Sequence, residues 1–119
     1  ALEMAGITHS DIDLAMIYDS FTYTVLVSLE NLGFCGPGEA PDFVAAQITA
    51  PGGDFPLNTN GGGLSYTHPG MYGIFTVVEA VRQLRGQAGN RQLDKCDIAV
   101  AHGTGGLLSS TGTVIMGAG

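Results

Sequence analysis

The spacing of apolar residues divides the chain into short buried runs and amphipathic stretches. Residues 14–18 form a continuous apolar run and residues 96–101 a nearly continuous one, which predicts two strands buried on both faces. Residues 21–32 carry apolar side chains at every third or fourth position, which predicts a helix that ends at Gly33. A similar stripe over residues 71–85 predicts another helix.

The remaining segments complete an α/β pattern. Residues 1–9 are typical of the end of a helix, and residues 41–48 predict a helix with proline in its first turn. Residues 107–116 are rich in Ser, Thr, Val and Ile, and predict the closing strand of a hairpin after a tight turn over residues 103–106. This order of elements predicts a mixed sheet covered by helices.

Composition narrows the class of protein. The 119 residues suit a single domain over residues 1–119, and 45% hydrophobic against 13% charged residues predicts a folded core rather than disorder. The apolar runs are too short for a transmembrane helix, and the first residues lack the basic region of a signal peptide. A net charge of −7 argues against binding to nucleic acid. We therefore expect neither a membrane nor a nucleic-acid partner.

Charged and sulfur-containing residues add little direct chemistry. The four basic residues all lie between residues 82 and 95 and could meet an anionic ligand, although a solvated helix end is the simpler interpretation. Cys35 and Cys96 are too few for a secreted disulfide scaffold, which favours a reduced, cytoplasmic setting. The cysteines and histidines lack metal-binding spacing, so we expect no metal site.

Three loops follow predicted strands, where open α/β sheets place their ligands. The first is residues 18–21, in which Tyr18 and Asp19 precede a helix. Asp19 or Ser20 is expected to cap that helix, and a catalytic role for Asp19 is the less economical alternative.

The second loop lies in residues 49–67, which are rich in Gly, Pro and Asn, with a short strand possible at 55–58. Residues 61–63 are three successive glycines, which allow a ligand to approach the backbone closely. His68 follows at the predicted start of a helix, where the positive helix end disfavours the imidazolium. A general base and a simple turn residue both remain open for His68.

The third loop is the sequence His-Gly-Thr-Gly-Gly over residues 102–106. His102 ends a predicted buried strand, and the backbone N–H groups of the following turn could form an oxyanion hole. A plain hairpin turn is the simpler alternative. A phosphate-binding loop is not expected, because no Gly-Lys-Ser/Thr follows.

Taken together, these loops resemble the C-terminal half of the thiolase superfamily, over nearly the whole chain. The most specific pieces are Asn-Thr-Asn-Gly-Gly at residues 58–62 and His-Pro-Gly at residues 68–70, which are similar to the Asn-x-Asn-Gly-Gly and Gly-His-Pro signatures. The sequence Gly-Leu-Ser-Tyr at residues 63–66 is most similar to that of bacterial lipid-transfer-protein or sterol-carrier-type thiolases. The resemblance implies a five-stranded mixed sheet covered by helices, paired with an N-terminal half in a layered α-β-α-β-α arrangement.

The resemblance implies an acyltransferase that forms or cleaves C–C bonds in acyl-CoA thioesters of lipid or sterol type. In thiolases, the histidine that matches His68 activates a nucleophilic cysteine in the other half. His102 stands where thiolases carry a second cysteine, and Tyr18 where they carry Asn or, in sterol-carrier types, His. The expected oxyanion and substrate-binding residues are Asp19, Asn60, Gly61, Gly62, Tyr66, Gly103 and Gly105.

Departures from the thiolase pattern leave alternatives. With the second cysteine absent, only His68, His102 or Tyr18 could remove the α-carbon proton in a Claisen condensation. Tyr18 in Tyr-Asp-x-Phe is similar to thiolase-like aldolases of steroid side-chain breakdown, which cleave β-hydroxyacyl-CoA with a tyrosine as base. Those aldolases replace the Gly-His-Pro histidine, which this chain keeps. A third alternative is a domain that binds acyl-CoA or a partner without chemistry.

The same resemblance implies the partners. Coenzyme A is expected as part of the substrate and not as a tightly bound cofactor. The expected protein partners are the N-terminal half, a second copy in a homodimer, and a small protein with a zinc ribbon and an OB-fold. The isolated chain is expected to be inactive. The acyl group stays open, because several residues either line an apolar pocket or belong to the core: Phe21, Tyr23, Phe55, Tyr66, Met71 and Tyr72.

Overall fold

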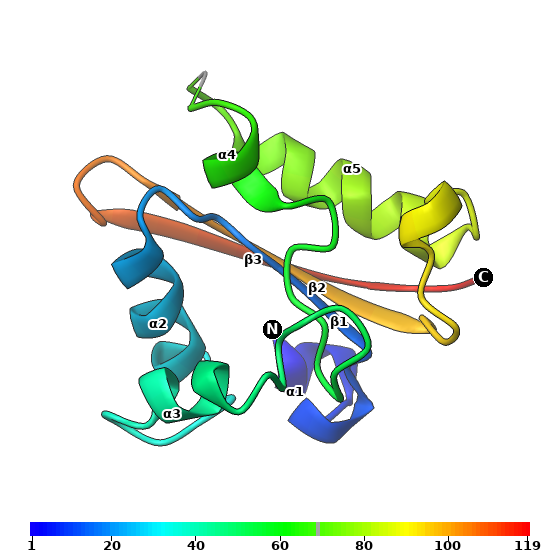
Figure 1. Cartoon of the computed structure of the whole chain (residues 1–119), viewed down its shortest axis with the longest axis horizontal. Coiled ribbons are helices and arrows are strands. Elements are labelled where there is room, and N and C mark those ends of the chain that lie inside the picture. The colour runs from blue at the N-terminus through cyan, green and yellow to red at the C-terminus, as the bar shows by residue number, and fades with distance from the viewer. Residues whose placement is uncertain (69) are drawn as a thin grey trace.

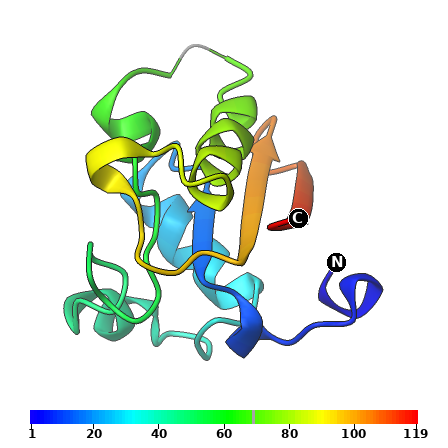
Figure 2. The ribbon, with the colours of Figure 1, turned by 90° about the vertical axis from the view of Figure 1, so that its right-hand side faces the viewer.

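A three-stranded sheet forms the middle of the molecule. In the computed structural model, which describes residues 1–68 and 70–119, strands β1 (Leu14–Ile17), β2 (Ile98–Gly105) and β3 (Ser110–Gly117) lie side by side in that order (Figure 2). β1 and β2 run parallel, and β2 and β3 form an antiparallel hairpin. The mixed sheet predicted from the sequence is confirmed.

Helices cover both faces of this sheet. Helix α5 (Gly73–Leu84) and the short α4 (Gly62–Ser65) lie on one side, and α2 (Thr22–Asn31) and α3 (Ala40–Ala45) lie on the other (Figure 1). The remaining elements are short, namely α1 (Leu2–Ala5) and the 3₁₀ turns His9–Asp11 and Gly89–Arg91. Helices on both faces of a mixed sheet agree with the fold class predicted from the sequence.

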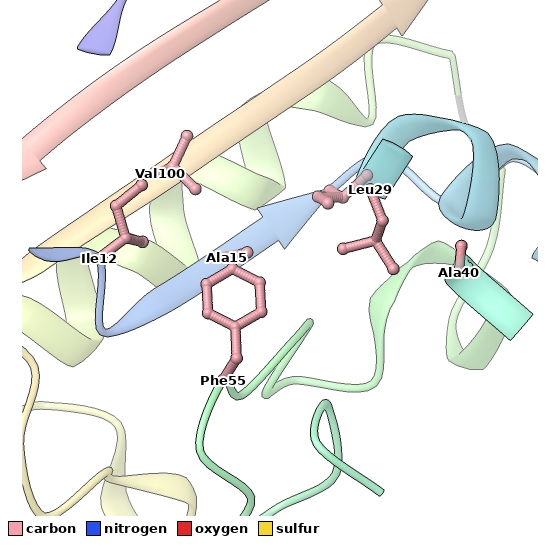
Figure 3. Close-up of a cluster of buried hydrophobic side chains, with 7 residues drawn as sticks. Ile12, Ala15, Leu29, Ala40, Phe55 and Val100 are labelled. Atoms are coloured by element: carbon pink, nitrogen blue, oxygen red, sulfur yellow. The ribbon is translucent and has the colours of Figure 1, made fainter. Parts of the chain in front are cut away.

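The alternation of side chains along the strands divides the core into two clusters. Leu14 and Met16 point toward α5, where Ala80 is fully buried and lets the helix approach the sheet. Ala15 and Ile17 point to the opposite face and join a second cluster, which Figure 3 shows between the sheet, α2 and α3: Ile12, Leu29, Ala40, Phe55 and Val100. All four residues of β1 are buried, which confirms a strand covered on both faces.

The helix predicted over residues 71–85 is present, but part of its apolar stripe does not face the sheet. Ile74, Phe75 and Val78 are 59%, 48% and 39% exposed. The side of α5 that meets the sheet carries Val77, Ala80 and Leu84, which pack with Leu14 and Met16. Beside them lie several buried polar residues: Thr76, Glu79 and Gln83. The periodicity therefore identifies the helix correctly, whereas the exposed part of its stripe and the buried polar residues do not follow from it.

The expected five-stranded sheet is wrong for this chain. Among the described residues the sheet has three strands, and Leu57 adds only an isolated parallel bridge to Ala15. Pro56 has no N–H group to donate to a ladder, and Asn58 adopts a positive φ of 49° that turns the chain away from β1. The short strand that residues 55–58 could have formed is thus present only as a single bridge.

The tight turn predicted over residues 103–106 is displaced toward the C-terminus. β2 continues to Gly105, and Gly103 and Gly105 lie opposite Gly112 and Ser110 in the ladder with β3. The hairpin turn follows from Gly106, where φ is 62°. Small side chains along both strands allow the hairpin to extend beyond the apolar run on which the prediction rested.

Candidate active site

Tyr18 and His68 meet at the end of β1. The Tyr18 hydroxyl lies 3.3 Å from Nδ1 of His68, and the two rings are edge-on with centroids 5.8 Å apart. Tyr18 directly follows β1 and is 8% exposed, whereas His68 comes from the exposed loop between α4 and α5. The structure thus brings together two of the three residues predicted to be catalytic. Pro69, the next residue of the predicted signature, lies outside the described residues.

The hydrogen bond between these residues can carry a proton in either direction. Tyr18 donates when Nδ1 of His68 is unprotonated, and accepts when Nδ1 carries the hydrogen. A separation of 3.3 Å is long for a hydrogen bond, as is common for catalytic pairs before substrate binds. The pair is chemically suited to general acid and base work.

Aromatic packing fixes the Tyr18 ring from behind. Tyr72 lies edge-on to Tyr18 with centroids 5.3 Å apart, and Phe75 stacks on Tyr72 at 5.6 Å. The Tyr72 hydroxyl is buried without a hydrogen bond of good geometry among the described residues. Burial and the Asp19 carboxylate raise the pKa of Tyr72, and the nearby Asn60 amide opposes this effect. Tyr72 therefore stays neutral and acts as a support.

Asp19 does not cap the helix that follows it. Helix α2 begins at Thr22, and Phe21 at its N-cap makes no side-chain capping bond. The Asp19 carboxylate, 5% exposed, instead accepts hydrogen bonds from the backbone N–H groups of Gly63 at 2.7 Å and Leu64 at 3.1 Å. The capping prediction for Asp19 is wrong, because a second set of free N–H groups competes for its carboxylate.

The glycines of the loop are required by this close contact. A Cβ on Gly62 would lie 2.2 Å from Oδ2 of Asp19, and Gly62 has a φ of 68°. Gly61 has a φ of 92° and lets the chain turn into α4. Oδ1 of Asn60 accepts from the N–H of Gly62 at 2.9 Å, so this side chain stabilises the same turn.

Asn58 and Glu79 attach the loop at two further points, which the sequence did not single out. The Asn58 amide donates to the carbonyl of Ile17 at 2.9 Å and accepts from its N–H at 2.8 Å, replacing a peptide of a neighbouring strand. Glu79, 2% exposed, accepts from the Thr59 hydroxyl at 2.9 Å and forms a two-point ion pair with Arg91. The Asn-x-Asn motif includes Asn58, but it does not predict that the Asn58 side chain bonds to the backbone of Ile17.

An open cavity of about 1120 Å³ adjoins the pair. Tyr18 and His68 lie in its lining beside apolar side chains from α2, the start of α5 and the β2–β3 turn: Phe21, Tyr23, Met71, Ile74, Leu107 and Leu108. Of the aromatic residues left open by the sequence, Phe55 belongs to the core, and Tyr66 and Tyr72 line a separate cavity of about 370 Å³. The larger cavity thus places an apolar surface beside the Tyr18–His68 pair.

His102 lies on the opposite face of the sheet from Tyr18. It pairs with Ile17 in the parallel register, so its side chain shares the α2 face, and Nδ1 lies 2.8 Å from the Thr113 hydroxyl. Burial lowers the pKa of His102. Its cavity, of about 290 Å³, also receives Ser28 and Thr24 from α2. The structure therefore separates His102 from the Tyr18–His68 pair.

The cysteines lie away from this pair. Cys35 and Cys96 are both half-buried and free, and burial raises the pKa of Cys96 to about 11. Neither lines the cavity beside Tyr18. In the part of the chain that the structure describes, no group of three His, Cys, Asp or Glu side chains could hold a metal ion. No helix among those residues is long and apolar enough to cross a membrane.

Comparison with known protein families identifies the family of this chain. The family described as thiolase C-terminal domain-like matches residues 1–118. The chain belongs to the thiolase C-terminal domain-like family. The resemblance inferred from the loop motifs is thereby confirmed.

Individual relatives are consistent with this family. The chain is 47% identical to 17-hydroxy-3-oxo-4-pregnene-20-carboxyl-CoA lyase of Mycobacterium tuberculosis, over 85% of this chain and 26% of the lyase. It is 48% identical to a steroid side-chain-cleaving aldolase of Thermomonospora curvata, over 85% of this chain and 25% of the aldolase. It is 39% identical to acetyl-CoA acetyltransferase of Methanothermobacter thermautotrophicus, over 89% of this chain and 28% of that enzyme.

A solved structure shares the fold. The Ltp2-ChsH2(DUF35) aldolase superposes with a TM-score of 0.80 and 37% identity, over 98% of this chain and 29% of that chain. The present chain spans about a quarter of the length of the curated relatives above. The thiolase-like domain is therefore common to lyases and acyltransferases.

Proposed function

We propose that this domain provides the proton-transfer residues of an enzyme that cleaves β-hydroxyacyl-CoA by retro-aldol chemistry. The observation that carries the proposal is the contact of 3.3 Å between the Tyr18 hydroxyl and Nδ1 of His68 beside a large apolar cavity. Two relatives that are 47% and 48% identical to this chain are named as a lyase and an aldolase, which supports this reaction class. The alternative that the sequence left open thus becomes the preferred function.

The pair suits each step of the cleavage. Tyr18 takes the proton of the β-hydroxyl group while it passes its own hydroxyl proton to Nδ1 of His68. The oxygen's electron pair forms the new carbonyl, the Cα–Cβ bond breaks, and its electrons become the enolate of the thioester. The imidazolium then returns a proton through Tyr18 to the α-carbon. The products are a ketone or aldehyde and a shorter acyl-CoA, without oxidant, water or free coenzyme A.

The substrate class follows from the cavity and from the relatives. An open apolar cavity of about 1120 Å³ is large enough for a bulky acyl group, because pockets for drug-sized ligands measure about 300–1,000 Å³. The names of the two lyase-type relatives refer to steroids. We therefore place the substrate among lipid or sterol-type acyl-CoA thioesters, with coenzyme A as part of the substrate.

Acyl transfer is the second candidate. His68 occupies the Gly-His-Pro position, and an acetyl-CoA acetyltransferase is 39% identical to this chain. In that reaction His68 would activate a cysteine in the N-terminal half. Tyr18 occupies the hydrogen-bonding position on Nδ1 of His68, leaving Nε2 for such a cysteine.

The exposed apolar face of α5 points to protein partners. Ile74, Phe75 and Val78 line up on a helix face that no described residue covers fully. An N-terminal half of the same protein is the proposed cover, together with a second copy in a homodimer. The solved relative is named as an aldolase with a DUF35 protein, which supports a separate partner protein, and we propose for it a small protein with a zinc ribbon and an OB-fold. A cytoplasmic location is proposed for the assembly.

The test compares two substrates in the full-length protein. A β-hydroxyacyl-CoA is offered without free coenzyme A, and a β-ketoacyl-CoA is offered with it, and products are identified by mass spectrometry. We expect cleavage of the hydroxy substrate, and a loss of about 10²–10⁴-fold in kcat for Tyr18→Phe. Cleavage of the keto substrate alone, with Tyr18→Phe fully active, would replace the retro-aldol proposal by thiolysis.

A further inference from the structure

Tyr18 is flanked by two attachments of the same loop. On its N-terminal side, the Asn58 amide pairs with both backbone groups of Ile17. On its C-terminal side, the Asp19 carboxylate binds the N–H groups of Gly63 and Leu64. The loop that carries His68 is therefore tied to the chain immediately before and immediately after Tyr18.

The Asp19 contact is made by a buried carboxylate, whereas the Asn58 contact is made by a neutral amide, and their distances are similar. Each carboxylate oxygen accepts a hydrogen bond from one N–H group, and Asp19 is only 5% exposed. Gly62 approaches so closely that a methyl group would overlap Oδ2 at 2.2 Å. Charge-assisted hydrogen bonds of this kind are about twice as strong as neutral ones. The carboxylate thus fixes the loop four residues before His68.

Asp19 is absent from the lining of the cavity that holds Tyr18 and His68. Its oxygens point at the backbone of α4, and its low exposure leaves little surface for a substrate. The cavity beside Tyr18 and His68 therefore gives no support to the substrate-binding role expected for Asp19, which instead lines a separate cavity of about 490 Å³. The Asp19 carboxylate lies directly beside Tyr18, but its hydrogen bonds go only to the loop that carries His68. This arrangement indicates a role in holding the loop.

We propose that Asp19 is a positioning residue, which clamps the loop of residues 58–68 and so holds His68 within hydrogen-bonding distance of Tyr18. This inference rests on the retro-aldol function proposed above, because its kinetic consequence requires the Tyr18–His68 pair to act in the reaction. The clamp itself is a property of the loop that can be measured without turnover.

The experiment uses Asp19→Asn in the full-length protein, since this change keeps the shape of the side chain and removes one acceptor. Gly62→Ala provides a second variant, because its methyl group displaces the same carboxylate. Asp13→Asn is the matched control. Asp13 lies at the other end of β1 and also accepts two backbone N–H groups, from Asp97 and Ile98, but far from the loop.

Three readouts separate the possible roles. They are kcat on a β-hydroxyacyl-CoA, the Kd of the matching acyl-CoA that lacks the β-hydroxyl group, and hydrogen exchange of residues 58–68 by mass spectrometry. For Asp19→Asn and Gly62→Ala we expect kcat to fall about tenfold or more, the Kd to stay within about twofold, and loop exchange to accelerate. Asp13→Asn should change none of the three.

Several outcomes would overturn the inference. A Kd weakened as much as kcat falls would make Asp19 a substrate-binding residue. Unchanged kcat with a loosened loop would make the clamp irrelevant to catalysis, and equal effects of Asp13→Asn would reduce it to general stability. Tyr18→Phe, run in parallel, distinguishes failure of the function: if that variant is fully active, the retro-aldol proposal fails, while loop exchange still reports on the clamp.

Discussion

The buried ion pair between Glu79 and Arg91 leads to an unequal pair of mutations. Glu79 is 2% exposed in its side chain, whereas Arg91 is 35% exposed. Removing Arg91 leaves a carboxylate inside the protein, but neutralising Glu79 leaves a guanidinium that can turn to water. We therefore expect Arg91→Met to be more damaging than Glu79→Gln, although each breaks the same contact.

The magnitudes follow from the remaining partners. A buried charge that loses its partner costs about 3–5 kcal/mol, and the lower value applies here, because Thr59 still donates to the carboxylate. Glu79→Gln keeps an acceptor for Thr59 and costs about 1 kcal/mol, the usual value of one hydrogen bond. For a chain of this length, about 4 °C of Tm corresponds to 1 kcal/mol. The expected losses are thus about 12 °C and about 4 °C.

Thermal and urea unfolding of the variants, followed by circular dichroism, measure these losses. The double variant Arg91→Met/Glu79→Gln supplies the decisive comparison, since a neutral glutamine no longer buries a charge. We expect the double variant to be more stable than Arg91→Met alone. If it is equally or less stable, or if Glu79→Gln is the worse single change, the argument from the buried carboxylate is refuted.

Two further predictions concern pH. Burial lowers the pKa of His102 from its ordinary 6.5, so below about pH 6.5 the unfolded chain binds a proton more readily than the folded chain does. The free energy of unfolding should therefore decrease as the pH falls below about 6.5. Urea titration of His102→Gln between pH 5 and 7 should show a smaller decrease. Burial raises the pKa of Cys96 from 9.0 to about 11, so stability that is complete below pH 9 should be lost between pH 9 and 11. The same titration on Cys96→Ala should reduce this loss, and an unaltered alkaline limb would show that Cys96 is not its source.

Local elements were largely predictable because they depend on short-range spacing. The apolar run at residues 14–18 predicts β1, and the repeat over residues 21–32 predicts α2, which the structure has at Thr22–Asn31. The sequence motifs of the loops also identify Tyr18 and His68 as candidates without knowledge of their contact. Such features are written in neighbouring residues, whose side-chain directions follow from strand and helix periods.

The orientation of those elements could not be predicted in the same way. An apolar stripe on α5 indicates a helix, but Ile74 and Val78 face outward, while Glu79 and Gln83 are buried. These two polar side chains are held by hydrogen bonds that join Glu79 to Thr59 and Arg91 and Gln83 to Leu93. Hydrophobic spacing carries no information about such a buried polar network.

The class of fold and the residues capable of proton transfer could be inferred from the sequence, since both follow from local patterns and motifs. Which of these candidates lie side by side depends on the folded chain. Register puts His102 on the face opposite Tyr18, and the loop brings His68 to Tyr18 across 50 positions of the chain. Asp19 accepts hydrogen bonds from N–H groups 44 and 45 positions away instead of capping the helix that follows it. Contacts over such separations depend on how the whole chain packs, and no local pattern specifies them.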